Sequence, residues 1–278
     1  MIFYGTIANS LSGKIMKVYY QIFKISLANQ LEYRANFVSG FLFSLVPFAV
    51  NVLLWIAVSY QSGAMPLQTG GIVSYYFVTL ITYNITSTVS VFKISDDIRL
   101  GSLNQYLIKP YNYALYQLAA DLSHRFVFIV MNAVPITVLY FLLKRYFVFT
   151  ISAWKIVFFV AFLVAGYLIN FLIDFLIALY SFYFSRVSSL YTSIRVLKHI
   201  SAGIIFPLIL LPEPVFALLK NTPFVFISHI PVGLLLDDMP IRAVLLSLFQ
   251  ACGWIAALAL LSAIVWKKGL RIYSAYGG

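Results

Sequence analysis

The chain has 278 residues, of which 62% are hydrophobic and only 10% charged, and its mean hydropathy is +0.94. Soluble domains carry about 25% charged residues, so this composition excludes a soluble protein and predicts an integral membrane protein. The net charge of +11 is first a sign of membrane topology, and no nucleic-acid partner is inferred from it. The single cysteine, Cys252, excludes an intrachain disulfide, and no metal-ligand spacing occurs in the sequence.

The first predicted element is an amphipathic helix over residues 10–36, where basic and apolar side chains alternate. Such a helix lies in the membrane interface with its lysines toward the lipid headgroups. A plain basic cytoplasmic tail is the alternative. The sequence does not open with a long apolar stretch and a small-residue cleavage site, so we expect the first span to act as the insertion signal.

Two predicted spans follow, Phe37–Tyr60 and Ile72–Phe92, and each is long enough to cross because about 20 apolar residues suffice. An uncharged outer loop at 61–70 joins them. The second span is unusually polar in its middle, where Thr82 and Asn84 lie. Since polar groups in lipid favour protein partners, this span either packs against other helices or lines a transport pathway.

A polar loop at 93–112 then interrupts the hydrophobic pattern. Asp97 is placed to cap a following helical turn, and Gly101 is placed to break that turn. A short amphipathic helix should follow and end near Lys109, because a proline comes next. Its apolar face is formed by Leu103, Tyr106 and Leu107. This pattern predicts either a helix that docks on a partner protein or a solvated loop.

The third predicted span, Leu115–Leu143, carries three ionisable residues near its start. Asp121 and Arg125 are four residues apart, so they share one helix face and can pair. We expect this ion pair to extend toward the cytoplasmic interface, since the positions lie near a helix end. A proton relay through His124 is the alternative.

The fourth predicted span, Trp154–Phe184, contains an acid about two-thirds of the way along it. This acid, Asp174, follows Asn170 by four residues on the same helix face. An acid at such a depth is the most functional-looking single residue of the chain. The alternative is a structural hydrogen bond, or a salt bridge to a cation on another helix.

The last third of the chain is less regular. A fifth span begins at Ile194 or Ile200 and ends by Leu211, and a sixth is predicted at Ile241–Trp266. Between them, residues 212–232 contain four prolines and two apolar patches. This segment predicts broken helices that dip into the membrane, which is allowed only where protein buries the backbone.

The 93–112 loop resembles the first cytoplasmic loop of type-2 ABC exporter permeases, in the branch with the pattern D-I-R-x-G-x-L … L-x-K-P. The matching residues are Asp97, Ile98, Arg99, Gly101, Leu103, Leu107, Lys109 and Pro110. The tail at 266–278, with W-x-x-G-L-R-x-Y directly after the last span, resembles the same branch.

The resemblance implies a coupling helix at 97–110 that contacts a separate ATP-hydrolysing subunit, with Tyr106 on the same helix. It also implies an elbow helix at 10–36 and a re-entrant helical hairpin at 212–232 on the outer side. ATP and Mg²⁺ are then bound by the partner, and no cofactor is expected in this chain. The expected location is the bacterial inner membrane.

The charge distribution provides a separate test of this topology. If both termini are cytoplasmic, 14 of the 19 Lys and Arg residues lie inside. The other five are Lys144, Arg145, Lys155, Lys220 and Arg242. This bias is typical of six spans with both termini in the cytoplasm.

The sequence therefore predicts one all-α integral membrane domain over 1–278, with six transmembrane helices, an interfacial elbow helix and a re-entrant outer hairpin. Its predicted function is the non-catalytic permease subunit of an ATP-driven ABC exporter. It pairs with a second copy or a sister permease in the lipid bilayer, and its cargo is hydrophobic or amphiphilic. The candidate pathway residues are Asp174, Asn170, Thr82 and Asn84.

Two other function classes stay open. An ion-coupled secondary transporter would use Asp174 and would need no ATPase. A membrane-embedded lipid-modifying enzyme would need acids, histidines or a cysteine gathered near an interface. The three histidines fall on different predicted segments, so the sequence does not predict such a cluster.

Overall fold

The computed structural model describes residues 2–32, 34–62, 69–184 and 186–273. Every regular element in these ranges is helical. The long helices are α1 (Ile2–Glu32), α2 (Arg34–Ser62), α3 (Thr69–Thr86), α6 (Tyr113–Leu143), α7 (Ala153–Leu179) and α11 (Ile241–Ile272). The shorter α-helices are α4 (Val91–Arg99), α5 (Asn104–Leu107), α8 (Ser188–Ser201), α9 (Glu213–Leu219) and α10 (His229–Leu236). Four 3₁₀ helices complete the described chain: η1 (Lys144–Tyr146), η2 (Tyr180–Phe182), η3 (Leu208–Leu210) and η4 (Pro223–Phe226).

Five helical stretches in the described ranges are long and apolar enough to cross a membrane. They are Phe37–Tyr60, Thr69–Arg99, Tyr113–Tyr146, Ala153–Phe182 and Ile241–Ile272. They coincide with the predicted spans one to four and six, so the all-helical membrane fold is confirmed. The outer loop at 61–70 and the tail at 266–278 lie partly outside the described residues.

The predicted fifth span has a different form. Helix α8 already begins at Ser188 and ends at Ser201, and the chain then turns through Gly203. Gly203 has a φ of +74°, and its carbonyl accepts a 2.6 Å hydrogen bond from the Tyr75 hydroxyl, so the turn is closed tightly. The short η3 follows in place of a continued α-helix. A sixth helix long and apolar enough to cross a membrane is therefore not among the described elements, and six spans stay a prediction.

The segment predicted to dip into the membrane consists of α9, η4 and α10. Its irregular middle packs on α7, where Gly166 provides the necessary space. A Cβ at Gly166 would lie 2.5 Å from the Phe226 carbonyl oxygen. Phe226 itself is fully buried. The protein interior thus covers this irregular backbone, as a segment at membrane depth requires.

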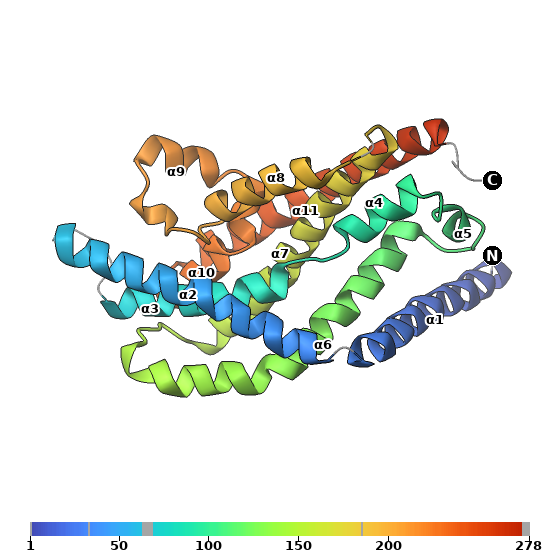
Figure 1. Ribbon diagram of the computed structural model, residues 1–278. Helices are drawn as coiled ribbons and strands as arrows, with labels where there is room; N and C mark the ends of the chain where they lie inside the picture. Colours follow the sequence, from blue (N-terminus) through green and yellow to red (C-terminus); the bar gives the residue numbers. More distant parts are fainter. Residues whose placement is uncertain (1, 33, 63–68, 185, 274–278) are drawn as a thin grey trace.

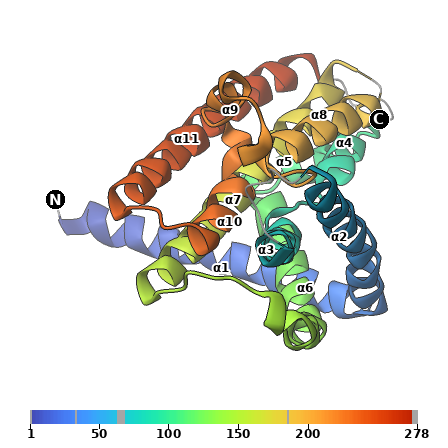
Figure 2. The same cartoon turned by 90° about the vertical axis from the view of Figure 1, so that its left-hand side faces the viewer.

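Helix α7 occupies the centre of the molecule. It packs against α3, α4, α10 and α11, and Figure 2 shows it surrounded by these helices. Apolar side chains lie on all sides of α7, and residues such as Phe162 and Ile169 are fully buried. A helix that is hydrophobic all round belongs in a core, which explains why this sequence takes the central place.

The peripheral helices α2, α6 and α11 carry apolar side chains outward. Phe43, Val134 and Phe249, one on each helix, are 74%, 71% and 80% exposed. So much exposed apolar surface on a soluble protein would drive association. In a bilayer the same side chains contact the lipid chains.

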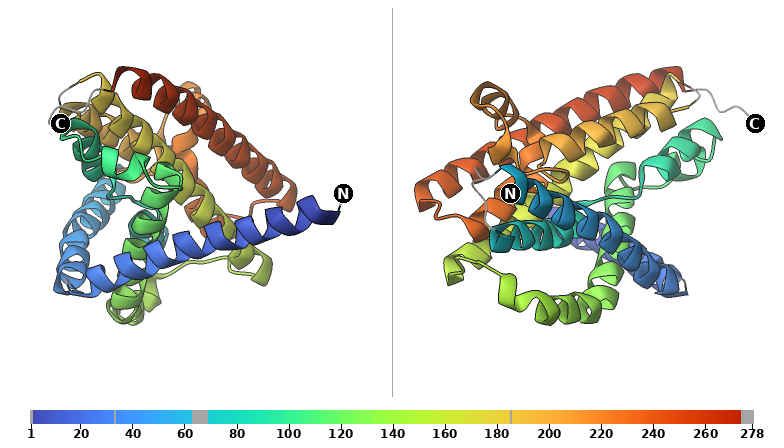
Figure 3. Two further views of the ribbon diagram at one scale, coloured as in Figure 1. Left: turned by 90° about the vertical axis from the view of Figure 1, so that its right-hand side faces the viewer. Right: turned by 60° about the vertical axis from the view of Figure 1, so that its left-hand side comes forward.

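Helix α1 runs obliquely across the bundle (Figure 3) and packs along α6. The rings of Phe23 and Phe126 meet edge to face at 6.0 Å. The Tyr19 hydroxyl accepts a 3.0 Å hydrogen bond from the backbone N–H of Asn112. Lys17 and Lys24 are exposed. Residues 10–32 of the amphipathic helix predicted over 10–36 thus belong to the longer α1, and residues 34–36 belong to α2. The place of this helix at the membrane interface stays a prediction.

Candidate functional site

The predicted docking loop connects α4 to α6 and contains the short α5. It lies at the end of the molecule where α11 also ends (Figure 1). Several polar side chains of this loop and its flanking helices meet at one buried acid, which fixes the shape of the loop.

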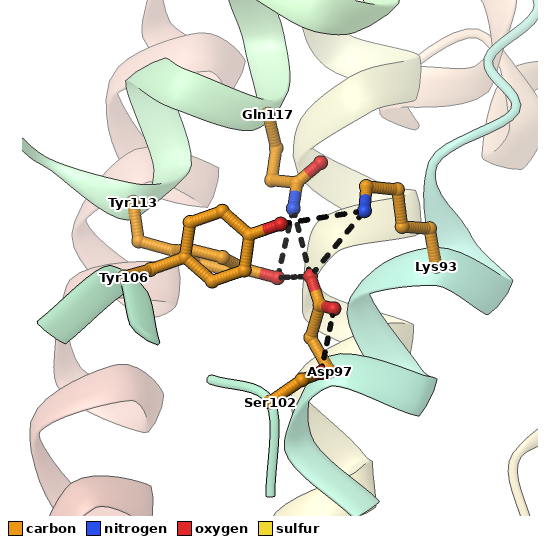
Figure 4. A network of polar contacts seen from close by, with 6 residues as sticks. All are labelled: Lys93, Asp97, Ser102, Tyr106, Tyr113 and Gln117. Atoms are coloured by element: carbon orange, nitrogen blue, oxygen red, sulfur yellow. Dashed lines mark hydrogen bonds and ion pairs between the residues drawn. The ribbon is translucent and has the colours of Figure 1, made fainter. Parts of the chain in front are cut away.

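That acid is Asp97, which is only 7% exposed (Figure 4). Its Oδ1 accepts a 2.9 Å hydrogen bond from Ser102 Oγ. Its Oδ2 accepts from Tyr113 Oη at 2.7 Å and from Gln117 Nε2 at 3.1 Å. The ammonium of Lys93 lies 3.9 Å from the same oxygen. Hydrogen bonds to a carboxylate are among the stronger ones in proteins, so Asp97 joins α4, the loop and the start of α6.

The backbone of the loop turns at Gly101, whose φ of +81° favours glycine. This turn returns the chain to α4, and the N–H of Leu103 donates to the Asp97 carbonyl at 2.8 Å. Leu103 is fully buried beside Ile94 and Ile98. The predicted break at Gly101 is therefore present, and the loop is anchored by a polar and an apolar contact.

Three details differ from the predicted docking helix. Helix α4 continues to Arg99, so Asp97 lies inside a helix and does not cap the next one. Helix α5 ends at Leu107, before Lys109, because only one turn follows the glycine. Ile98 and Leu103, predicted to contact a partner, face the protein core instead.

The accessible surface of the loop is formed by other side chains. Leu100 is 62% exposed, Leu107 41% and Ile108 85%. Cations flank them: Arg99 pairs with Asp96 at 3.0 Å, and Lys109 is exposed. Three apolar side chains between cations form a surface suited to a protein partner with an acidic rim.

Tyr106 lies between the buried and the exposed part of the loop. Its hydroxyl is 3.5 Å from the Lys93 ammonium, and the Lys109 ammonium lies 5.7 Å from its ring centre. Its ring meets that of Tyr113 at 5.3 Å. Burial raises the pKa of Tyr106, and the charge of Asp97 raises it further. The phenol therefore stays protonated and neutral beside the acid.

A second polar region lies where α3 ends and α4 begins, in the non-helical residues 87–90. Ser87 and Ser90 each keep one helical backbone hydrogen bond, but an interruption of this kind within a span leaves other backbone groups that lipid cannot satisfy. Buried side chains from α6 and α7 satisfy them. The interruption therefore places the predicted polar middle of the second span against protein.

Asp121 and Arg125 on α6 bind the two ends of this interruption. Asp121 accepts hydrogen bonds from Val89 N at 2.9 Å and Ser90 Oγ at 2.7 Å, at the start of α4. Arg125 donates at 3.0 Å to the Asn84 carbonyl, near the end of α3. The negative charge of Asp121 faces the positive N-terminal end of the α4 dipole, and the positive charge of Arg125 faces the negative C-terminal end of the α3 dipole. Both interactions are favourable. The predicted ion pair between these residues is wrong, and both are buried rather than extended toward the interface.

Asp174 on α7 is 3% exposed and binds a cation from α8. Lys198 Nζ donates to Asp174 Oδ1 at 2.5 Å and to Asn170 Oδ1 at 2.8 Å. Thr88, from the helix interruption, donates its hydroxyl to the other oxygen of Asp174. Asn170 also donates at 2.9 Å to the Thr86 carbonyl. The structure therefore brings Asp174 and Asn170 together in a salt-bridged network, which was the structural alternative.

The other two predicted pathway residues do not join this network through their side chains. Thr82 is fully buried, and its hydroxyl has no partner in the described part of the chain. The Asn84 side chain donates to the Leu80 carbonyl of its own helix at 2.8 Å. Neither residue is brought toward Asp174 by a hydrogen bond.

The histidines do not meet. His124 lies on α6 against Phe37, His199 on α8 against Tyr83, and His229 on α10. Among the described residues there is no group of three His, Cys, Asp or Glu side chains that could hold a metal ion.

Comparison with known protein families identifies the family of this chain. The family model described as "ABC-2 family transporter protein" matches residues 45–277. The chain belongs to the ABC-2 transporter family. The match covers the chain from α2 to the end of α11, which confirms the resemblance to type-2 ABC permeases. A search of curated proteins gave no match.

ABC-2 membrane proteins are transport components that associate with ATP-binding subunits in a bilayer. In this ABC-2 protein, sequence reasoning counted Lys198 as a cytoplasmic cation and Thr88 as a polar residue of the second span, and it did not predict that both bind Asp174. The available signal was the run of serine and threonine at 86–90, which is too polar for the middle of a continuous span.

Proposed function

We propose that this chain is the permease subunit of an ATP-driven ABC exporter. Two permeases, identical or paired with a sister chain, enclose the pathway, and separate ATPase subunits bind ATP and Mg²⁺ beneath them. The observation that carries this proposal is the loop after α4, where the Asp97 network fixes the backbone while Leu107 and Ile108 stay exposed.

This arrangement suits a coupling element. An ATPase that binds the exposed face of α5 moves a segment that Ser102 bonds to Asp97 on α4, and Tyr113 bonds the same carboxylate to α6. Movement therefore passes to two spans through Asp97 rather than being lost in a flexible loop. In this proposal Asp97, Ile98, Gly101 and Leu103 give the loop its shape. The exposed Arg99, Leu107, Ile108 and Lys109, with Tyr106 behind them, meet the partner.

The proposed topology has six crossings with both termini in the cytoplasm of the bacterial inner membrane. Support comes from the path of the chain in Figure 1. Helices α7 and α11 both end near the predicted docking loop at 93–112, called the coupling loop from here on. The chain between these two helices therefore returns to the opposite end of the molecule. Helix α8 and residues 202–211 form that return. In this proposal α1 is the elbow helix, and α9 to α10 form the re-entrant outer segment.

The proposed cargo is hydrophobic or amphiphilic, such as a drug, antibiotic, peptide or lipid. A groove of about 230 Å³ between α2, α3 and the chain after α8 supports this. Its walls include Pro47, Phe48, Tyr76 and Tyr83, with polar atoms from Asn51. A second permease would close this groove into a pathway.

The test is a mild-detergent purification of the tagged chain from its native membrane, followed by mass spectrometry. We expect a soluble ATPase to co-purify. The double variant Leu107→Ser/Ile108→Ser should lose it. The matched control Val215→Ser/Leu218→Ser removes two exposed apolar side chains from α9 and should retain it. Equal retention by both variants would contradict the docking role.

The same experiment separates the ATPase-coupled permease from an ion-coupled transporter. If the chain is recovered alone and transports in liposomes under a proton gradient, the ABC exporter proposal is wrong. Asp174 would then become the first candidate for the coupling site.

A further inference from the structure

A cavity of about 350 Å³ lies at the end of the molecule opposite the coupling loop. Small-ligand sites have volumes of about 300–1,000 Å³, so the cavity suits a small organic molecule. Its walls come from α3, α9, α10 and the chain around η3. Most of the lining side chains are apolar. The lining residues used in the argument below are Tyr75, Leu208, Phe216, His229, Leu236 and Asp237.

The only acid in this lining is Asp237, directly after α10. Its carboxylate has no hydrogen bond or ion pair with the residues that the structure describes. The nearest cation, Lys155, is engaged elsewhere: it donates to Thr150 Oγ1 at 2.7 Å and to the Asp237 backbone carbonyl at 2.9 Å. Lys155 also lies 3.5 Å from Asp238 Oδ1. The exposed carboxylate of Asp237 therefore makes no direct hydrogen bond or ion pair among the described residues.

The carboxylate lies over α10 and the cavity. Its Oδ2 is 3.4 Å from the position that a Cβ on Gly233 would take, and Gly233 lines the same cavity. Burial raises the pKa of Asp237, and Lys155 opposes that shift. Because the carboxylate lies at the edge of a mostly apolar cavity, a cationic partner there is attracted more strongly than in bulk solvent.

A second polar residue of the cavity lining is His229. The Nδ1 atom of His229 is buried and has no hydrogen-bond partner in the described chain. Its ring stands edge to face with Phe216 at 5.8 Å. A histidine is mostly neutral at pH 7, so one ring nitrogen accepts a hydrogen bond. The Tyr75 hydroxyl is already committed to the Gly203 carbonyl at 2.6 Å.

We propose that this outer cavity binds a small organic cation, a primary or secondary ammonium with an apolar body. The ammonium lies against Asp237 and donates to His229, and the apolar body packs on Phe216, Leu208 and Leu236. The interpretation of this ligand as cargo at the outer end of the pathway rests on the proposed exporter function. The binding itself does not.

The test uses the full-length protein in nanodiscs of neutral phosphatidylcholine and three probes of similar shape. These are phenethylammonium, 2-phenylethanol and phenylacetate, and binding is measured by calorimetry. We expect saturable binding of phenethylammonium that is at least about tenfold tighter than that of the alcohol, since one charged hydrogen bond is lost. Equal binding of the ammonium and the alcohol would overturn the proposal.

The matched variants are Asp237→Asn and Asp238→Asn, two neighbouring acids of which only the first lines the cavity. Asp237→Asn should reduce the affinity for phenethylammonium to that of the alcohol, and Asp238→Asn should leave it unchanged. Equal effects of the two substitutions would count against the site.

A labelling experiment on the unmodified protein covers the case in which Asp237→Asn does not fold. A photoreactive aryl amine should label peptides from α9 or α10, and excess phenethylammonium should prevent this. Labelling elsewhere overturns the site. Because neither measurement needs an ATPase, failure of this proposal leaves the co-purification result intact. Failure of the exporter proposal equally leaves amine binding in place.

Discussion

Lys198 on α8 and Asp174 on α7 form a buried ion pair with 2.5 Å between Nζ and Oδ1. Both residues are no more than 5% exposed. This pair attaches the short helix α8 to the central helix of the fold, close to the interruption between α3 and α4.

Removing one member of this pair should destabilise the protein strongly. We expect Asp174→Asn or Lys198→Met to lower the free energy of unfolding by about 3–5 kcal/mol, because each leaves an uncompensated buried charge. The double variant Asp174→Asn/Lys198→Met should recover most of this loss. Thermal unfolding of the purified protein in detergent measures all three. Additive losses in the double variant would show that the two charges are not coupled.

The Asp97 network predicts a difference between Tyr113, at the start of α6, and Tyr111, in the loop before it. Tyr113→Phe removes a hydrogen bond to a buried carboxylate, which costs about 1.5–3 kcal/mol. It should also weaken retention of the ATPase, because the loop loses its bond to α6. The control is Tyr111→Phe, since Tyr111 lies in the same loop and stacks on Tyr116 through its ring. Unfolding temperature and co-purification are measured together, and indistinguishable variants would refute the role of the network.

Gly101 should tolerate asparagine better than alanine. Its φ of +81° costs a residue with a Cβ about 1–2 kcal/mol, and asparagine adopts this region more readily than alanine. We expect Gly101→Ala to increase proteolysis within the loop, with a smaller increase for Gly101→Asn. The result that would speak against the turn is equal protease sensitivity in wild type and Gly101→Ala.

Two glycines in long helices provide a matched comparison of packing. Gly166→Ala places a methyl group 2.5 Å from the Phe226 carbonyl and should cost about 1–3 kcal/mol. Gly253→Ala meets nothing within 4 Å and should be neutral or stabilising, because alanine favours helix. The unfolding temperatures of the two variants and the wild type measure this difference in stability. A neutral Gly166→Ala would mean that η4 does not pack tightly on α7.

The long apolar spans could be predicted from the sequence because hydropathy alone identifies them. The position of the coupling loop and its turn at Gly101 also follow from local rules, since glycine favours that backbone conformation. The fifth span could not be placed correctly. Its helix ends at Ser201 because Gly203 turns the chain toward Tyr75, a contact between residues 128 positions apart.

Partners of buried charges were the hardest to predict. Asp121 and Arg125 are four residues apart, and local spacing favoured their pairing. Their actual partners include backbone groups at the two ends of the interruption between α3 and α4. These contacts depend on how α3, α4 and α6 pack together, which local spacing does not determine. Burial of Asp97 was hidden in the same way, because its partner Tyr113 lies beyond the loop.

The interruption between α3 and α4 has a consequence for biosynthesis. The Thr69–Arg99 stretch has a mean hydropathy of 1.2, against 2.6 for Ala153–Phe182, so it is the least able to enter lipid on its own. Its unsatisfied backbone groups find Asp121 and Arg125 on α6, and then Asn170 on α7, all of which the ribosome makes later. We therefore expect stable insertion of this stretch to wait for the downstream helices, so that the nascent chain integrates as a group of segments rather than one span at a time.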